Sequence, residues 1–327
     1  MTTTEEPTVT TTQRNAVQDV TAIRNPGWAP EHVQGQYSDS NSHSDLYRFL
    51  MQWIDVSTYL NIGYSKFWQR HLKNDNFIRL IDRLAKPMIE LHSNSIHKNE
   101  KKLVDVGSGR GGAGIHANKA YGLEVLGVDL TPYNVNQANE NAKKRGVSGH
   151  VSFIEGNALD IPVPSESVPM VWSIESPAHF PDKRKFVTEV YRILKPGGIF
   201  TFSDLLAVEQ NINTYPDEYH GFLRVWDVPY LETYQSYLTM LKEIGFEIQH
   251  SEIVTKNNID VYVRHARRYL LYFKLPGFYR SYERWLRKKW GANLDNVREH
   301  MQLSYDALSR HTIDYGLFWA IKPASNS

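Results

Sequence analysis

The sequence predicts an α/β fold, a seven-stranded sheet with helices on both faces. Seven short apolar segments typical of buried strands run from "LVDVG" (103–107) to "YGLFWAIK" (315–322). Segments with helical apolar spacing separate most of them. A glycine-rich turn, "GSGRGG" (107–112), follows the first strand. Because strands that alternate with helices form parallel sheets, we expect a parallel sheet.

The other elements follow from the same patterns. Predicted strands cover 124–130, 150–158, 169–176, 197–206 and 246–254, and predicted helices cover 112–122, 131–146, 186–194 and 230–245. Gly122 and Gly146 stand just past two of these helices, and Pro132 stands in the first turn of one, which are favoured positions for these residues.

Composition divides the chain into five parts. Large apolar side chains recur at helical spacing over 45–92, with an interruption near 61–63. We expect a mobile N-terminal segment (1–43), an N-terminal helical lid (44–100), a core (101–254), a basic and aromatic helical insertion that covers the substrate (255–312), and a last core strand with a tail (313–327).

Composition also excludes several functions. The 327 residues include no cysteine, which excludes disulfides, thiolate metal sites and a cysteine nucleophile. The formal net charge of +1 gives no overall attraction to nucleic acid. No apolar run approaches the ~20 residues of a membrane span, and the Thr-rich N-terminus does not resemble a secretory signal. We therefore expect a cytoplasmic protein, and the sequence leaves its oligomeric state open.

Acidic residues flank the glycine turn, which has the pattern G-x-G-x-x-G through Gly107, Gly109 and Gly112. Asp105 precedes the turn and could meet a cationic amino group. Asp129 ends the next strand, at the spacing of a carboxylate that accepts bonds from ribose hydroxyls. Asn157 and Ala158 follow the third strand, where an adenine ring could lie. A purely structural turn or a nicotinamide dehydrogenase would share the glycines and would leave Asp105 unexplained.

These segments, with "LKPGG" (194–198), resemble the class I S-adenosylmethionine-dependent methyltransferases. The resemblance implies a Rossmann-like sheet and S-adenosyl-L-methionine as cofactor. It places cofactor contacts at Asp105, Gly107, Ser108, Gly109, Gly111, Asp129, Leu130, Asn134, Asn157, Ala158 and Ser173.

Two further segments narrow the resemblance. "YLNIGYSKFW" (59–68) and "VWSIESPAHFPDK" (171–183) are similar to motifs of tocopherol, sterol and related small-molecule methyltransferases, although Ser65 stands where that group often has Trp. With the long insertion, they also resemble bacterial terpene C-methyltransferases of the sodorifen type, which act on farnesyl diphosphate.

A carboxylate and an imidazole end the fourth predicted strand, at Glu175 and His179. In the crevice at the strand ends, Glu175 would lie beside the transferred methyl group. Methylation of an alkene carbon leaves a carbocation, which a carboxylate stabilises and can later deprotonate. The alternative is a carboxylate that binds only backbone amides or cofactor. We expect Glu175, Tyr64, His179 and His220 to be catalytic, and Trp68, Tyr219, Phe222 and Trp226 to line the acceptor site, where aromatic rings also stabilise a cation.

The insertion is strongly basic. Residues 264–289 hold nine Lys or Arg, seven aromatic residues and one Glu. Such a segment could be a solvated helical face, a peripheral membrane contact or a single-strand nucleic-acid site. We favour a lid over an apolar, anionic substrate such as a prenyl diphosphate, bound by Arg264, Arg267 and Arg268. No DDxxD motif is present, so any Mg²⁺ would be carried mainly by the diphosphate.

The predicted function is therefore S-adenosylmethionine-dependent C-methylation of a small lipophilic acceptor, best a prenyl diphosphate, with or without cyclisation. Alternatives within the enzyme class are O-, N- or C-methylation of a phenol, alkaloid or sterol-like lipid. An inactive cofactor-binding scaffold or a membrane-associated binding module would keep the glycine turn without turnover. The acids Asp105, Asp129 and Glu175 favour the enzyme.

Overall fold

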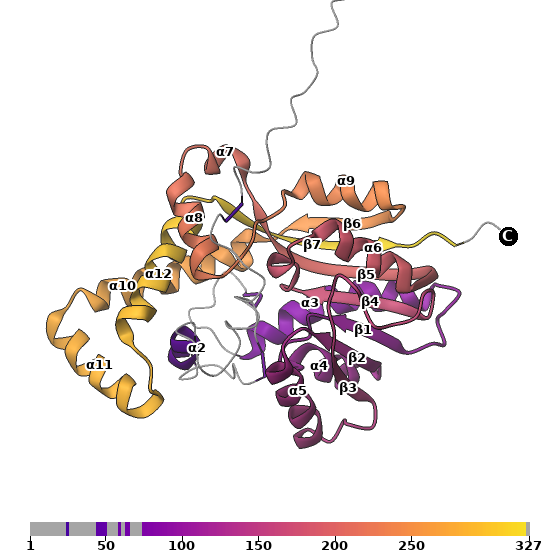
Figure 1. Ribbon diagram of the computed structural model, residues 1–327, viewed down its shortest axis with the longest axis horizontal. Coiled ribbons are helices and arrows are strands. Elements are labelled where there is room, and N and C mark those ends of the chain that lie inside the picture. Colours follow the sequence, from indigo (N-terminus) through magenta and orange to yellow (C-terminus); the bar gives the residue numbers. More distant parts are fainter. Residues whose placement is uncertain (1–23, 26–43, 51–57, 60–62, 66–73, 325–327) are drawn as a thin grey trace, which may run out of the picture.

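The computed structural model describes residues 24–25, 44–50, 58–59, 63–65 and 74–324 (Figure 1). Most of the predicted mobile segment 1–43, much of the predicted lid, and Trp68 lie outside these residues.

The sheet has seven strands, in the order β3-β2-β1-β4-β5-β7-β6. Their bounds are β1 Lys102–Val106, β2 Glu124–Asp129, β3 Val151–Glu155, β4 Val168–Ile174, β5 Leu194–Ala207, β6 Glu247–Ile253 and β7 Ile313–Ile321. The central strands are buried on both faces, which explains their almost continuous apolar sequences. All seven coincide with predicted strands, and the Rossmann-like fold is confirmed.

The sheet is mixed, so the expectation of an entirely parallel sheet is wrong for β7. Strands β1 to β5 pair in parallel, whereas β7 runs antiparallel to both β5 and β6. The reason is where the chain travels between β6 and β7. It stays at the edge where β6 ends, forms helices there, and re-enters the sheet from that edge (Figure 1). A strand that enters from the carboxyl edge must run antiparallel.

Two groups of helices cover the faces of the sheet. One face packs against α3 (Asn74–Ser93), α4 (Gly112–Tyr121) and α5 (Pro132–Lys144), and the other against α6 (Lys183–Ile193) and α9 (Tyr234–Ile244). The helix α3, which lies within the predicted lid, is part of this core. Nε1 of Trp319 on β7 donates a 3.0 Å hydrogen bond to the carbonyl oxygen of Leu84 in α3.

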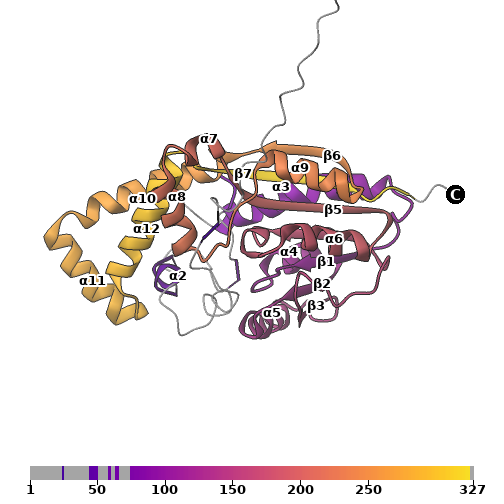
Figure 2. The ribbon, with the colours of Figure 1, turned by 45° about the horizontal axis from the view of Figure 1, so that its top comes forward.

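Further helices stand at the carboxyl edge of the sheet and form a cap (Figure 2). They are α2 (Ser44–Leu50), α7 (Glu209–Ile212), α8 (Pro216–Val225), α10 (Ile259–Phe273), α11 (Pro276–Trp290) and α12 (Leu294–Ser309). Helices α2, α10, α11 and α12 share an apolar cluster of their own that includes Phe49, Leu270 and Leu286. None of the helices that the structure describes is long and apolar enough to span a bilayer.

Candidate active site

The glycine turn joins β1 to α4 and requires glycine at its first position. Gly107 has a φ of 71°, and an ideal Cβ there would overlap the side chain of Ser176. Oγ of Ser176 donates a 2.7 Å hydrogen bond to the carbonyl oxygen of Gly107. The N–H of Gly107 donates to the carbonyl oxygen of Val128 on β2. The turn is thereby fixed between two strand ends, with its backbone open to a cavity.

Asp129, at the end of β2, organises the rim of this cavity. Oδ2 accepts a 2.8 Å hydrogen bond from the N–H of Gly109, and Oδ1 accepts bonds from the N–H of Thr131 (3.0 Å) and from Nδ2 of Asn134 (3.2 Å). Burial raises the pKa of the Asp129 carboxyl, and these donors oppose the increase. Oδ2, which accepts one of these three bonds, has a lone pair for a further donor.

Asp105, on β1, is the most deeply buried acid of the cavity. Its Oδ2 has no hydrogen-bond partner among the described residues, and the same holds for Oγ of Ser108 and Oδ1 of Asn134. Burial raises the pKa of Asp105 to about 7, the side chain of Trp172 and the backbone of Gly114 oppose the increase, and the nearby charge of Asp129 adds to it. Buried polar atoms are normally paired. Three unpaired polar atoms around one cavity therefore indicate a polar ligand.

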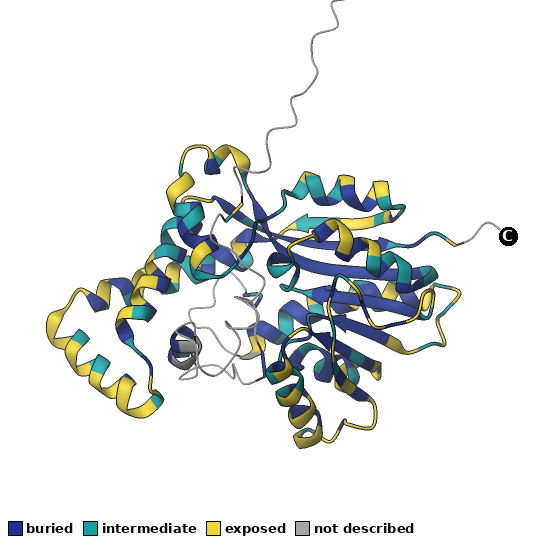
Figure 3. Cartoon of the chain, in the orientation of Figure 1, coloured by how far each residue is buried: buried dark blue, intermediate teal, exposed yellow. Residues whose placement is uncertain are grey.

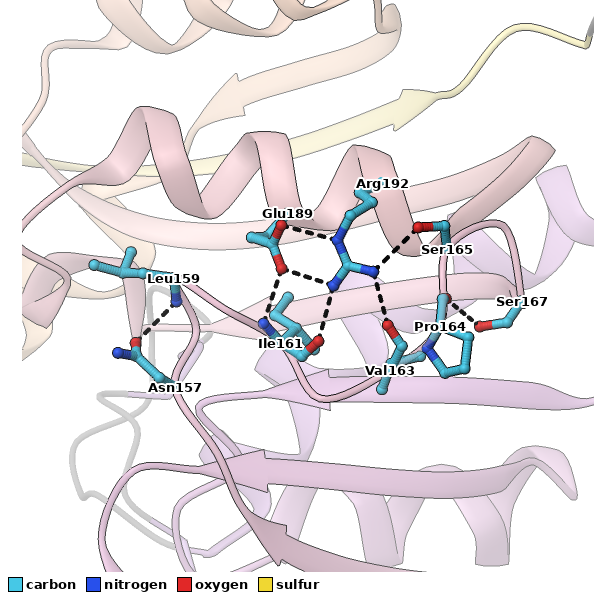
Figure 4. A network of polar contacts seen from close by, with 9 residues as sticks. All are labelled: Asn157, Leu159, Ile161, Val163, Pro164, Ser165, Ser167, Glu189 and Arg192. Atoms are coloured by element: carbon cyan, nitrogen blue, oxygen red, sulfur yellow. Dashed lines mark hydrogen bonds and ion pairs between the residues drawn. The ribbon is translucent and has the colours of Figure 1, made fainter.

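The loop after β3 forms another wall and is held from α6 (Figure 4). Nη2 of Arg192 donates to the carbonyl oxygen of Ile161 at 2.8 Å, and Oε2 of Glu189 accepts from the N–H of Ile161 at 2.9 Å. Arg192 and Glu189 also bond to each other. Oδ1 of Asn157 accepts a 2.9 Å hydrogen bond from the N–H of Leu159. The loop thus keeps Asn157 and Ala158 at the cavity wall.

Glu175 follows β4 in a conformation that non-glycine residues seldom adopt, with a φ of 59°. Its N–H donates to the carbonyl oxygen of Ser203 at 3.1 Å, so the backbone is tied to β5. Its Oε1 accepts a 2.6 Å hydrogen bond from the hydroxyl of Tyr315 on β7. Glu175 lines the same cavity as Asp105. Strain of this kind, held in place by neighbouring strands, is concentrated at functional sites.

A buried lysine supports the turn that carries His179. Nζ of Lys183 donates to the carbonyl oxygens of Ala178 (3.3 Å) and Phe180 (2.9 Å) and lies 3.9 Å from the centroid of the Tyr230 ring. Burial lowers the pKa of Lys183, and the nearby carboxylate of Asp204 opposes the decrease. The short helix Pro177–His179 is thereby fixed beside the cavity.

The structure brings most of the predicted cofactor residues together. Those that line the cavity with the predicted catalytic residues Glu175 and His179 are Asp105, Gly107, Ser108, Gly109, Asp129, Leu130, Asn134, Asn157 and Ala158. Two others lie beneath it. Gly111 precedes α4, where an ideal Cβ would be 2.6 Å from the Phe153 ring, and Ser173 donates its buried hydroxyl to the carbonyl oxygen of Val106.

The remaining predicted residues that the structure describes are not among the described residues that line this cavity. Tyr64 is partly buried and packs against the main core, and Tyr219 and Phe222 are buried within that core. Nε1 of Trp226 donates a hydrogen bond to Oγ of Ser304. His220 is on α8, half-buried. Arg264, Arg267 and Arg268 are exposed on α10, opposite the residues Ala266, Leu270 and Phe273 that pack in the cap. The roles predicted for these residues stay predictions.

Sequence reasoning missed several residues of the site. Tyr315 appeared only as part of an apolar strand, and Ser176 only as the last residue of another predicted strand, although both bond to the cavity wall. Thr58 and Tyr59 line the cavity, next to the "N-x-G-Y" segment. A hydroxyl within an otherwise apolar buried strand was the available signal for Tyr315.

Comparisons with known proteins agree with this geometry. Residues 104–202 match the family model described as "Methyltransferase domain". A probable chloroplastic tocopherol O-methyltransferase of Oryza sativa subsp. japonica is 35% identical over 46% of this chain and 43% of that protein. A sterol 24-C-methyltransferase of Pneumocystis carinii is 29% identical over 62% of this chain and 55% of that protein. The chain thus spans about half the length of these relatives.

A solved structure shows the same fold over almost the whole chain. The geranyl diphosphate C-methyltransferase of Streptomyces coelicolor, in complex with Mg²⁺, geranyl diphosphate and S-adenosyl-L-homocysteine, superposes with a TM-score of 0.59 at 15% identity, covering 90% of this chain and 97% of that chain. The likeness establishes the fold.

Proposed function

We propose, from the premise that residues 104–202 form a class I S-adenosylmethionine-dependent methyltransferase domain, that the protein methylates a carbon atom of a small lipophilic acceptor. The observation that carries this proposal is the carboxylate of Glu175, which faces the same cavity as the buried acids Asp105 and Asp129. Asp105 and Asp129 bind the cofactor, and Glu175 stabilises positive charge on the acceptor.

The polar groups of the cavity fit S-adenosyl-L-methionine. The unpaired Oδ2 of Asp105 suits a cationic amino group, and the turn Gly107–Gly109 lines the cavity, where a ligand can approach its backbone. Asp129 suits ribose hydroxyls, as carboxylates at this place do in nucleotide-binding sheets. Asn157 and Ala158 suit the adenine. When bound, the cofactor supplies a methyl group on a positively charged sulfur.

Glu175 supports transfer to carbon. A carboxylate held at a fixed place stabilises positive charge that develops on an acceptor, and it can take the proton that restores an alkene. Its orientation is set by Tyr315 and by the backbone bond to β5, so little reorganisation is needed during the reaction. Oxygen or nitrogen acceptors need at most a base, without a cation to stabilise.

The names of the similar proteins guide the choice of acceptor. They act on tocopherol, sterol and geranyl diphosphate, all of which carry an isoprenoid chain. We infer a prenyl diphosphate such as farnesyl diphosphate as the acceptor, with cyclisation as a possible further step of the cation. No group of three His, Asp or Glu side chains suited to a metal occurs in the described part of the chain. Any Mg²⁺ would arrive with the diphosphate.

One observation favours a second candidate, O-, N- or C-methylation of a phenol, alkaloid or sterol-like lipid. The relative with 35% identity is a tocopherol O-methyltransferase. The imidazole of His179, which lines the cavity, could act as the base for a phenol.

Incubation with methyl-labelled S-adenosylmethionine and a panel of acceptors tests the proposal. The panel contains farnesyl and geranyl diphosphates, a sterol and a tocopherol-type phenol, each with and without Mg²⁺. We expect label on a carbon of a prenyl diphosphate. Label on the phenol oxygen would support the second candidate and overturn the first. Failure of the protein to bind S-adenosylmethionine would overturn both.

A further inference from the structure

The helix α11 is unusually exposed for its length. Of its 15 residues, Leu286 is the buried one. With α10 it forms a hairpin that projects from the cap, away from the sheet (Figure 1), and its surface is largely exposed (Figure 3). Since helices in proteins are stabilised mainly by packing an apolar face, a helix this exposed is suited to a further partner.

Exposed apolar side chains gather on this hairpin. Of the eight exposed large hydrophobic side chains in the described part of the chain, five lie here: Leu271, Tyr272, Leu275, Phe278 and Trp285, which are 40–55% exposed. Four of these five stand around the turn between α10 and α11, where Pro276 begins the second helix. The tip of the hairpin is therefore an apolar surface.

Aromatic rings continue this surface along α11. Tyr272 and Phe278 have ring centroids 5.7 Å apart, Phe278 and Tyr282 stack at 5.3 Å, and Tyr282 and Trp285 stack at 5.4 Å. Tyr282 stacks on both Phe278 and Trp285, and Nζ of Lys289 lies 5.3 Å from the centroid of the Trp285 ring. The faces of Tyr282 and Trp285 are therefore occupied within the helix, whereas binding of single-stranded nucleic acid would need them free to stack on bases.

The hairpin also carries exposed basic side chains. Lys274, Arg280, Arg284, Lys288 and Lys289 are all exposed. The acidic residue of α11 is Glu283, and it pairs with Arg287 at 2.7 Å. An apolar tip, a row of interfacial aromatic residues and an excess of positive charge match the surface of a bilayer that contains anionic lipids.

We propose that the α10–α11 hairpin, residues 259–290, docks the protein on an anionic lipid bilayer. Leu275 and Phe278 enter the boundary between headgroups and acyl chains, and Arg280 and Arg284 bind lipid phosphates. A lipophilic acceptor dissolved in the bilayer would then be near the cap. Docking does not depend on which acceptor the cavity takes, and its measurement requires no turnover.

Flotation of the full-length protein with vesicles tests this proposal. One set of vesicles is phosphatidylcholine alone, and the other is an equal mixture of phosphatidylcholine and phosphatidylglycerol. We expect at least about tenfold stronger partitioning onto the anionic vesicles, weakening at high salt. The double variant Leu275→Ser/Phe278→Ser and the double variant Arg280→Glu/Arg284→Glu should each lower this partitioning about tenfold or more.

Matched controls use side chains far from the hairpin. Ile96→Ser removes an apolar side chain that is 74% exposed, and Lys98→Glu/Lys101→Glu reverses two exposed charges. Both should partition like the wild type, and all variants should bind S-adenosylmethionine equally. The proposal is overturned if the wild type does not float with anionic vesicles, or if the controls lose as much binding as the hairpin variants. Hairpin-dependent binding of a single-stranded oligonucleotide without vesicle binding would also overturn it.

Discussion

The hydroxyl of Tyr315 donates a 2.6 Å hydrogen bond to Oε1 of Glu175, across 140 residues of sequence. Tyr315 is fully buried on β7, and its hydroxyl lies 2.9 Å from Oγ of Ser203 on β5. Burial raises the pKa of Tyr315 well above its usual value, and the neighbouring Glu175 adds to the increase. The phenol therefore stays protonated and keeps one carboxylate oxygen in a fixed place.

Tyr315→Phe removes this donor and nearly preserves shape. If Tyr315 positions Glu175 for the reaction, kcat should fall about tenfold while KM changes little, because the carboxylate loses one hydrogen bond to a charged group. Tyr237→Phe is the matched control. Tyr237 is also fully buried and donates a 2.6 Å bond to a carboxylate, that of Asp204, which does not line the cavity. Equal kcat for the two variants would show that the Tyr315 bond is only structural.

Asp129→Ala should weaken binding of S-adenosylmethionine by about 1.5–3 kcal/mol, the value of a hydrogen bond to a charged group. The variant also removes the acceptor for the N–H of Gly109, so part of the loss comes from the turn. Asp160→Ala, which removes an exposed carboxylate on the nearby loop, should bind normally. Calorimetry that gives Asp129→Ala wild-type affinity would contradict the ribose assignment, and a preference for NAD would contradict the cofactor assignment.

Asp105 predicts a pH dependence. Its pKa of about 7 without ligand means that it is largely protonated below neutral pH, whereas a cationic amino group binds to its ionised form. Affinity for S-adenosylmethionine should therefore rise from about pH 6 to about pH 7.5, and Asp105→Asn should bind weakly at both values. An Asp105→Asn variant with the wild-type pH profile would show that another group titrates.

The same raised pKa affects stability without cofactor. Between the unfolded value of 3.8 and about 7, the folded state retains a proton that the unfolded state has lost. The contribution of Asp105 to the free energy of unfolding should therefore decrease as pH rises through this range. Urea unfolding of the wild type and of Asp105→Asn across this range measures the difference.

The strands could be predicted from sequence because each is a local apolar pattern. The direction of β7 could not, because it depends on where the chain leaves the helices that follow β6. The apolar pattern of "YGLFWAIK" (315–322) suits a parallel and an antiparallel strand equally well. Only the pairing of β7 between β5 and β6 decides it.

The residues of the site likewise fall into those that the sequence predicted and those that it did not. Asp105, Gly107 and Asp129 were predictable because adjacent strand ends meet at one edge of a sheet, so short spacing in sequence fixes their proximity. Tyr315 was not, because it reaches Glu175 through the antiparallel strand whose position the sequence did not reveal. The exposed position of Arg264 follows from which face of α10 packs in the cap, and that depends on α12.

The headgroup of the acceptor can be tested directly. If Arg264, Arg267 and Arg268 bind a diphosphate, farnesol should be methylated far more slowly than farnesyl diphosphate, because charge-assisted bonds to phosphate are lost with the headgroup. The variant Arg267→Ala/Arg268→Ala should narrow that difference, whereas Lys98→Ala/Lys101→Ala should preserve it. Equal turnover of alcohol and diphosphate would show that these arginines serve another purpose.

Single-turnover kinetics of Glu175→Gln, with saturating S-adenosylmethionine and the preferred acceptor, tests the central claim most directly. The amide preserves size and still accepts a bond from Tyr315, so folding and cofactor affinity should survive. Loss of the charge withdraws stabilisation from the transition state more than from the bound acceptor. We predict a rate about 10²-fold or more below that of the wild type, with acceptor affinity little changed. A wild-type rate would contradict the account and leave Glu175 a structural residue.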